Sequence, residues 1–280
     1  MTRPDAAAFY GVLADADIRA IASGARAADK PLWLNLGYWK EATTHPQACV
    51  AMARLLGSAA QLGAGDRVLD VGFGYAEPDM HWVESFGVAR IVGVNITPLH
   101  VDVARRRVAR RGLSERIKLH VGSATYLPFK DACFDRVVAL ECAFHFCTRE
   151  RFFAEAFRVL RPGGTMAVAD MLPLPGANWS GPIRQMRRRL IAIPNENMYD
   201  RVTYADKLRA SGFENVTVRS IAGNVYPPFA KCLKLSLANQ AAIESTVVHP
   251  DDEDVKAGRG TELWEKSGIS DYVVAAAERP

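Results

Sequence analysis

Two titratable residues lie where predicted strands of this chain end. His145 follows a run of strand-forming residues that ends at Leu140, and Asp170 closes the next such run. A carboxylate can orient an imidazole and fix its tautomer, and a histidine held in this way can take a proton from a reacting hydroxyl group. The pair therefore predicts acid–base chemistry with His145 and Asp170 as catalytic residues. The alternatives are a hydrogen-bonded packing role for His145 and a turn-capping role for Asp170.

A glycine loop precedes these residues in the chain. The strand-like residues 67–71 run into Gly72 and Gly74, and residues 77–86 have a helical pattern. Glycines lack the Cβ that would keep a ligand away from the backbone, and the N–H groups of the helix start would point at that ligand. The third glycine of dinucleotide-binding loops is replaced by Glu77, whose carboxylate would repel a diphosphate. The loop therefore predicts a nucleoside without phosphates, and an adenosine with an amino-acid tail, such as S-adenosylmethionine, fits this description.

The ends of three further predicted strands carry groups that suit a nucleoside. Ligands of open α/β sheets bind outside the carboxyl ends of the strands. Asn95 lies about twenty positions after Gly74, where a group is needed to hold the ribose hydroxyls. Asn95 could also cap the next helix, and the two roles are compatible. Ser123 and the backbone N–H of Ala124 could bind an adenine edge, and Glu141 follows the fourth strand near the glycine loop.

A regular alternation of strands and helices would position these residues. Strands separated by helices of about ten to fifteen residues predict a parallel sheet with right-handed crossovers. The expected fold class is α/β: a doubly wound, mostly parallel, seven-stranded Rossmann-like sheet with helical cap insertions. The strands are expected at residues 67–71, 90–94, 117–121, 135–140, 164–170, 215–222 and 271–277.

Two kinds of segment are expected to surround this sheet. Residues 1–60 are predicted to form an N-terminal helical arm and a lid, in which Tyr38 closes over the ligand or anchors the arm. Residues 61–280 are predicted to form the sheet domain. The alternating pattern is interrupted at about residues 171–200 and 224–267, where we expect cap insertions.

The composition excludes several classes of protein. The chain has 280 residues, enough for one large α/β domain, and its net charge of +4 is too mild to indicate a nucleic-acid partner. No apolar run reaches the length of about 18 residues that a membrane span needs, and the N-terminus lacks a signal-peptide core, so a cytoplasmic location is expected. Five cysteines without a Cys-x-x-Cys pair and six histidines without a His-x-x-x-His pair predict no metal site. The composition does not decide whether the chain forms a homo-oligomer.

Four motifs that occur in order make the assignment more specific. Together they resemble the class I S-adenosylmethionine-dependent methyltransferases over residues 33–170. The segment Asn35-Leu36-Gly37-Tyr38-Trp39 is similar to the bacterial small-molecule branch, which methylates sugars, macrolides and other secondary metabolites. The four motifs are Val68-Leu69-Asp70-Val71-Gly72-Phe73-Gly74, Gly93-Val94-Asn95-Ile96-Thr97, Leu127-Pro128-Phe129 followed by Phe134-Asp135, and Arg158-Val159-Leu160-Arg161-Pro162-Gly163-Gly164.

The resemblance implies roles for residues at matching positions. Asp70 would support the ammonium side of the cofactor, and Ile96 would pack on its adenine. Asn95 would hold the ribose, without the charge that an acid brings to this position. His145 and Asp170 match positions to which sugar O-methyltransferases of this type assign the base. The expected cofactor-binding residues are Tyr38, Asp70, Gly72, Gly74, Asn95, Ile96, Ser123, Ala124 and Glu141.

The predicted function is transfer of a methyl group from S-adenosylmethionine to a small-molecule acceptor, a hydroxyl of a secondary metabolite. Alternatives are an N- or C-methyltransferase and a non-catalytic cofactor-binding protein of the same fold. An NAD-dependent oxidoreductase would share the sheet but should show the third loop glycine. Nucleic-acid methylation is disfavoured because no aromatic-proline motif follows the fourth strand.

Overall fold

The computed structural model describes residue 18 and residues 31–176, 192–238 and 269–280. The predicted N-terminal arm, residues 1–60, lies outside this description except for residue 18 and residues 31–60. The cap insertions predicted at about residues 171–200 and 224–267 lie outside it at residues 177–191 and 239–267.

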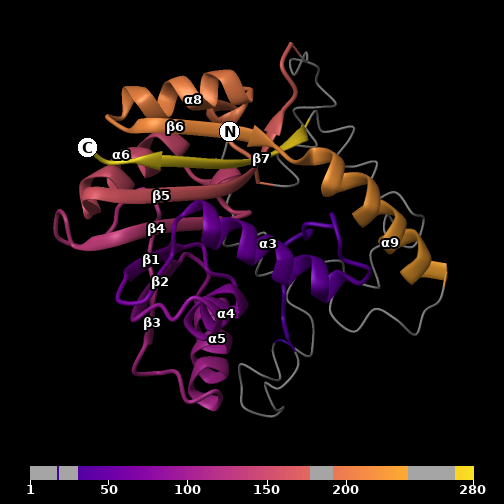
Figure 1. Cartoon of the computed structure of the whole chain (residues 1–280), viewed down its shortest axis with the longest axis horizontal. Coiled ribbons are helices and arrows are strands. Elements are labelled where there is room, and N and C mark those ends of the chain that lie inside the picture. The colour runs from indigo at the N-terminus through magenta and orange to yellow at the C-terminus, as the bar shows by residue number, and fades with distance from the viewer. Residues whose placement is uncertain (1–17, 19–30, 177–191, 239–268) are drawn as a thin grey trace.

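Seven strands form one sheet in the order β3-β2-β1-β4-β5-β7-β6, which runs from the bottom to the top of the view in Figure 1. Neighbours among β1 to β5 pair in parallel, and β7 is antiparallel to both β5 and β6. The doubly wound, mostly parallel seven-stranded fold is thus confirmed. The strands are β1 (Arg67–Val71), β2 (Arg90–Asn95), β3 (Ile117–Val121), β4 (Phe134–Leu140), β5 (Leu160–Pro173), β6 (Glu214–Ser220) and β7 (Ile269–Glu278).

Helices cover both faces of the sheet. On one face Val68 and Ile91 belong to the same core as α3, α4 and α5, and on the other Leu69 and Val92 pack with α6 and α8. This alternation explains why β1, β2 and β4 are mostly apolar, because the parallel part of the sheet is buried on both sides, whereas the edge strands β3 and β6 are partly exposed. The described helices are α3 (His45–Ala59), α4 (Glu77–Ser85), α5 (Pro98–Arg110), α6 (Arg149–Val159), α8 (Arg201–Ala210) and α9 (Tyr226–Ala238).

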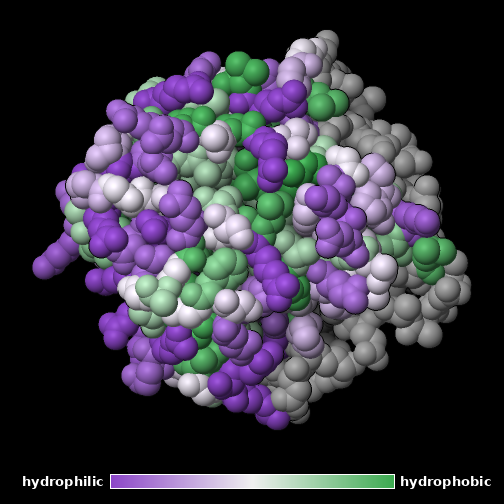
Figure 2. All heavy atoms as spheres, viewed as in Figure 1, coloured by the Kyte–Doolittle hydropathy of each residue, from purple (hydrophilic) through white to green (hydrophobic). Residues whose placement is uncertain are grey.

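Hydrophilic residues dominate the outer parts of the face shown in Figure 2, and hydrophobic residues form a band down its middle. Near the start of α9, Phe229 belongs to the core shared with α3, α4 and α5, and Tyr226 packs against it. None of the helices in the described part of the chain is both long and apolar enough to cross a membrane.

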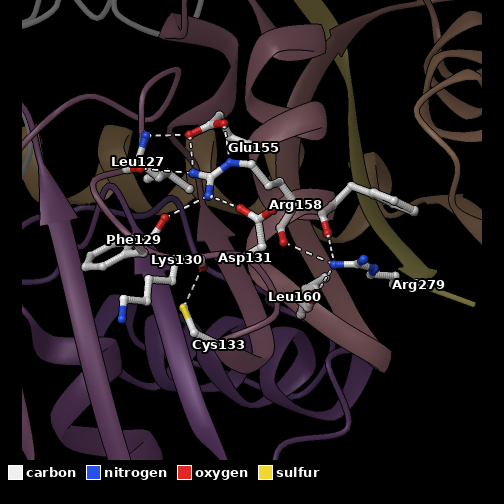
Figure 3. Close-up of polar contacts among 10 residues, drawn as sticks. Leu127, Phe129, Lys130, Asp131, Cys133, Glu155, Arg158, Leu160 and Arg279 are labelled. Carbon is white, nitrogen blue, oxygen red and sulfur yellow. Dashed lines mark hydrogen bonds and ion pairs between the residues drawn. The ribbon is translucent and has the colours of Figure 1, made fainter.

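Arg158, on α6, fixes the loop between β3 and β4 (Figure 3). Its guanidinium donates to both carboxylate oxygens of Glu155 at 2.8 Å, and to the carbonyl oxygens of Leu127 at 3.0 Å and Phe129 at 2.7 Å. Glu155 in turn accepts the backbone N–H of Leu127 at 2.6 Å. Two of the four sequence motifs are therefore in contact, and their contact holds a loop that begins with the predicted adenine-edge residues.

Replacing Arg158 with lysine is expected to lower the free energy of unfolding by about 1–3 kcal/mol. A lysine ammonium cannot match the fixed fork of guanidinium donors, so several charge-assisted hydrogen bonds are lost together. Denaturant unfolding measures the change. Arg209→Lys is the matched control, because Arg209 pairs with Asp206 at the surface and should cost less than about 0.5 kcal/mol. Equal losses in both variants would contradict the role given to Arg158.

Candidate functional site

A cavity of about 430 Å³ opens at the carboxyl edge of the sheet. Its walls come from the ends of β1, β2 and β4, the loop after β3, and the segment before α3. Tyr38 and Asp170 are not among the residues that line it. The predicted site residues that do line it are Asp70, Gly72, Gly74, Asn95, Ile96, Ser123, Ala124, Glu141 and His145.

The glycine loop requires glycine at both positions. Gly72 and Gly74 have φ values of +86° and +57°. Residues that carry a side chain rarely adopt this left-handed backbone conformation. A Cβ on Gly72 would lie 2.5 Å from the Cys142 sulfur, and one on Gly74 would lie 2.8 Å from Leu34 Cδ1. The loop is therefore a close-fitting cradle that a larger residue would fill.

Glu77, at the start of α4, is buried and forms an ion pair with Arg107 of α5. Its Oε1 also accepts the backbone N–H of Leu32 at 2.9 Å. The prediction that a free carboxylate here repels phosphates is therefore wrong, because Arg107 neutralises the charge of Glu77. Glu77 instead joins the two helices to the segment that precedes α3.

Glu141 fixes that same segment from the other side of the cavity. Its Oε1 accepts the backbone N–H of Leu36 at 2.8 Å and the hydroxyl of Tyr272 at 2.5 Å. Burial raises the pKa of the Glu141 carboxyl to about 8. The side chain thus lines the predicted site and at the same time holds residues 31–39, which we call the lid segment.

Tyr38 does not reach the cavity that it was expected to close. Its backbone N–H bonds to the carbonyl of Ala48 on α3 at 2.8 Å, and its side chain packs against the core. The lid residues that line the cavity are Leu32, Leu34 and Asn35 instead. The aromatic pattern indicated a lid, but it gave no signal of which side chains face inward.

Asn95 forms a turn directly before α5 and does not cap that helix, whose N-cap residue is Thr97. Its Oδ1 accepts the backbone N–H of Thr97 at 3.0 Å, which leaves the side-chain NH₂ as the group to bind a ribose hydroxyl. Ile96 is 48% exposed and lines the cavity, an apolar surface suited to adenine. Ser123 Oγ lies 3.0 Å from the Thr125 hydroxyl, and both residues line the same wall.

Replacing Asn95 with aspartate is expected to tighten binding of S-adenosylhomocysteine about fivefold, or about 1 kcal/mol. The carboxylate keeps an acceptor for Thr97 and offers the ribose a charged one, and charged hydrogen bonds are roughly twice as strong as neutral ones. Titration calorimetry measures the change. Asn224→Asp, on an exposed turn outside the cavity, is the control and should leave the affinity unchanged. Weaker or unaltered binding of S-adenosylhomocysteine by Asn95→Asp would show that Asn95 does not bind the ribose.

His100 is a cavity residue that the sequence reasoning missed. It lies on the first turn of α5, its ring centroid is 4.6 Å from that of Tyr75, and burial lowers its pKa to about 4. The position offered a signal, because the helix after a parallel strand begins at the carboxyl edge, where ligands bind.

His145 lies in the 3-10 turn Ala143–His145 that follows β4. Its Nδ1 is 3.1 Å from the carbonyl oxygen of Ala192, so the proton of the neutral ring sits on Nδ1 and the lone pair on Nε2. The pKa of His145 is lowered to about 4, mainly by burial; the bond to the Ala192 carbonyl opposes this shift, and the positive charge of Arg149 adds to it. The ring is therefore a neutral acceptor at neutral pH.

Asp170 is fully buried and bonds to Arg149 rather than to His145. The Arg149 Nε donates to Asp170 Oδ2 at 2.8 Å, and the backbone N–H of Met171 donates to Oδ1 at 2.9 Å. Arg149 also donates to the backbone carbonyls of Met171 and Asn197. The carboxylate expected to orient the imidazole is thus bound to a buried arginine. Arginines are seldom buried, so the sequence gave no reason to place one here.

The residues of the cavity fit the cofactor that the sequence motifs imply. Asp70 is buried at the end of β1, and neither of its carboxylate oxygens has a hydrogen-bond partner among the described residues. A buried acid of this kind matches the ammonium group of an amino-acid tail. The cradle at Gly72 and Gly74 admits that tail close to the backbone, and Ile96 offers an apolar surface for the base.

Comparisons with known proteins agree with this geometry. A family described as "Methyltransferase domain" matches residues 69–168. The erythromycin 3''-O-methyltransferase of Saccharopolyspora erythraea is 38% identical over 257 residues, which cover 89% of this chain and 84% of that protein. The 27-O-demethylrifamycin SV methyltransferase of Amycolatopsis mediterranei is 28% identical over 258 residues, covering 89% and 92%.

Among solved structures, the cyclase SpnF matches 100% of this chain and 98% of its own, with a TM-score of 0.74 and 21% identity. This likeness establishes the fold. The sequence relatives, taken with the glycine cradle and the buried acid of the cavity, establish the family. The chain belongs to the class I S-adenosylmethionine-dependent methyltransferases, in the branch of bacterial natural-product enzymes, and S-adenosylmethionine is its cofactor.

Proposed function

We propose that this enzyme transfers a methyl group from S-adenosylmethionine to a hydroxyl group of a macrolide-type natural product or of a sugar attached to one. Support comes from the two relatives, whose names describe a 3''-O-methyltransferase of erythromycin and a methyltransferase of 27-O-demethylrifamycin SV. A hydroxyl acceptor needs a base, and His145 is the residue that we propose for it.

The observation that carries the proposal is the contact between His145 Nδ1 and the carbonyl of Ala192. This contact places the ring proton on Nδ1 and the lone pair on Nε2, in a side chain that lines the cofactor cavity. When bound, the cofactor supplies an electrophilic methyl group. The chain aligns the acceptor oxygen with it, which can contribute about 7–11 kcal/mol, and His145 Nε2 takes the hydroxyl proton. In this proposal Asp170 takes no part in proton transfer; its role is to bind Arg149.

An acceptor panel tests the proposal directly. The enzyme is incubated with S-adenosylmethionine carrying a labelled methyl group and with macrolides and glycosides that offer free hydroxyl, amine and activated carbon positions. We expect label on oxygen, and analogues in which the same hydroxyl is already methylated or absent should stay unlabelled. Label on nitrogen or carbon would instead show that the enzyme is an N- or a C-methyltransferase.

The cytoplasm is the proposed location of the enzyme. All five cysteines are free thiols, which suits a reducing compartment. A homo-oligomer stays a prediction.

A further inference from the structure

A second carboxyl group lies beside the cofactor acid Asp70. Asp79, in the first turn of α4, is fully buried and lies within hydrogen-bonding reach of Asp70. None of the four carboxylate oxygens has a hydrogen-bond partner among the described residues when both groups are ionised. Two adjacent buried carboxylates cannot both hold their charge at low cost, so a single proton shared between them links the pair.

No positive charge in the described part of the chain offsets this pair. The ion pairs formed there by arginines and lysines do not involve Asp70 or Asp79. Burial raises the pKa of Asp79 to about 7 and, with repulsion from Asp79, raises the pKa of Asp70 well above its usual range.

Neighbouring titratable groups do not supply the missing charge. The Cys142 thiol donates to the carbonyl of Val71 at 2.9 Å, and burial and nearby carboxylates raise its pKa, so it is neutral. Glu141 is bonded to Leu36 and Tyr272. The cavity histidines His100 and His145 have pKa values lowered to about 4 and are neutral as well. Among the described residues, therefore, none supplies a positive charge to the pair.

We propose that Asp70 and Asp79 form a proton-sharing pair that releases its proton to solvent when the ammonium-bearing end of the cofactor binds, and that Asp79 is thereby a positioning residue for the cofactor. The proton and the ammonium group compete for the same negative charge. Asp70 lines the cavity and Asp79 lies behind it on α4, so Asp79 acts through Asp70. Cofactor binding should therefore tighten as the pH rises through neutrality.

Titration calorimetry with S-adenosylhomocysteine tests this proposal without any methyl transfer. Binding enthalpies measured near pH 6.5 in buffers of different ionisation enthalpy give the number of protons released. We expect about one proton per bound ligand in the wild-type enzyme, and a release that fades at higher pH. Methylthioadenosine, which has the nucleoside but lacks the amino-acid end, should bind without releasing a proton.

Asp79→Asn is the matched variant. The amide donates to the Asp70 carboxylate, so Asp70 is ionised before binding and the release should fall to near zero while S-adenosylhomocysteine still binds. Glu84→Gln, at an exposed acid of the same helix, should keep the full release. Wild-type release in Asp79→Asn, or no release by the wild type, would overturn the proposal. If Asp79→Asn does not fold, equal release with both ligands in the wild-type protein would overturn it too.

Discussion

Replacing His145 with alanine is expected to lower the rate of methyl transfer about 10²–10⁴-fold, the contribution of a positioned general base. The affinity for S-adenosylhomocysteine should change little, because the proposed role of His145 concerns the acceptor. Rate and affinity are measured separately, by label transfer and by calorimetry. His120→Ala, at an exposed position of β3, is the control and should keep the wild-type rate. A nearly normal rate of methyl transfer in His145→Ala would show that His145 is not the general base.

The pH profile of the wild-type enzyme tests the same role independently. The deprotonated ring is the active form, and burial lowers the pKa of His145 to about 4. At saturating S-adenosylmethionine and acceptor, where the pH dependence of cofactor binding does not enter, the rate should therefore stay constant through neutrality and fall only as the pH approaches that value. An acid limb near pH 6.5, the value of an exposed histidine, would contradict a buried base. The same shift makes the unfolded chain the better proton acceptor, so the free energy of unfolding should decrease as the pH falls from about 6.5 towards 4.

Replacing Arg149 with leucine is expected to lower the free energy of unfolding by about 3–5 kcal/mol. The change leaves the carboxylate of Asp170 buried without a counter-charge, and breaking a buried pair in this way carries a cost of that size. It also removes the donors to the carbonyls of Met171 and Asn197. Denaturant unfolding measures the loss.

A double-mutant cycle separates the ion pair from simple packing. In Arg149→Leu with Asp170→Leu no charge is left unpaired, so the double variant should lose less stability than the sum of the two single variants. Arg111→Leu, which breaks an exposed pair with Glu84, should cost less than about 1 kcal/mol. Additive losses in the buried pair would show that the two residues act independently.

Several strands of this protein were predictable because they are short, mostly apolar runs bounded by turn residues, as in β1, β2 and β4. β1, β2, β3 and β4 lie within one residue of their expected bounds, and β6 and β7 lie within two. β5 is the exception, because it begins at Leu160 and not at the expected residue 164, and so includes Pro162 and Gly163. Its pairing with β4 shifts register between Phe134 and Arg136, and this irregularity accommodates the proline and glycine in the strand.

The cavity was predictable to the extent that its residues end neighbouring parallel strands. Gly72, Asn95 and Ser123 meet because such strands share one carboxyl edge. The bond between Glu141 and Leu36 and the pair of Arg149 with Asp170 join distant parts of the chain. Spacing carries no signal of such contacts, because they depend on how the helices and the lid segment pack on the sheet.

The position of β7 has a consequence for how the protein is made. This strand lies between β5 and β6, and β6 pairs with no other strand of the sheet. During synthesis, β5 is complete at Pro173 long before β7 begins at Ile269, so the nascent chain exposes the open edge of β5. Unpaired edges of this kind invite pairing with other chains. Recombinant yield should therefore respond to slower translation at low temperature and to chaperones that shield nascent strands.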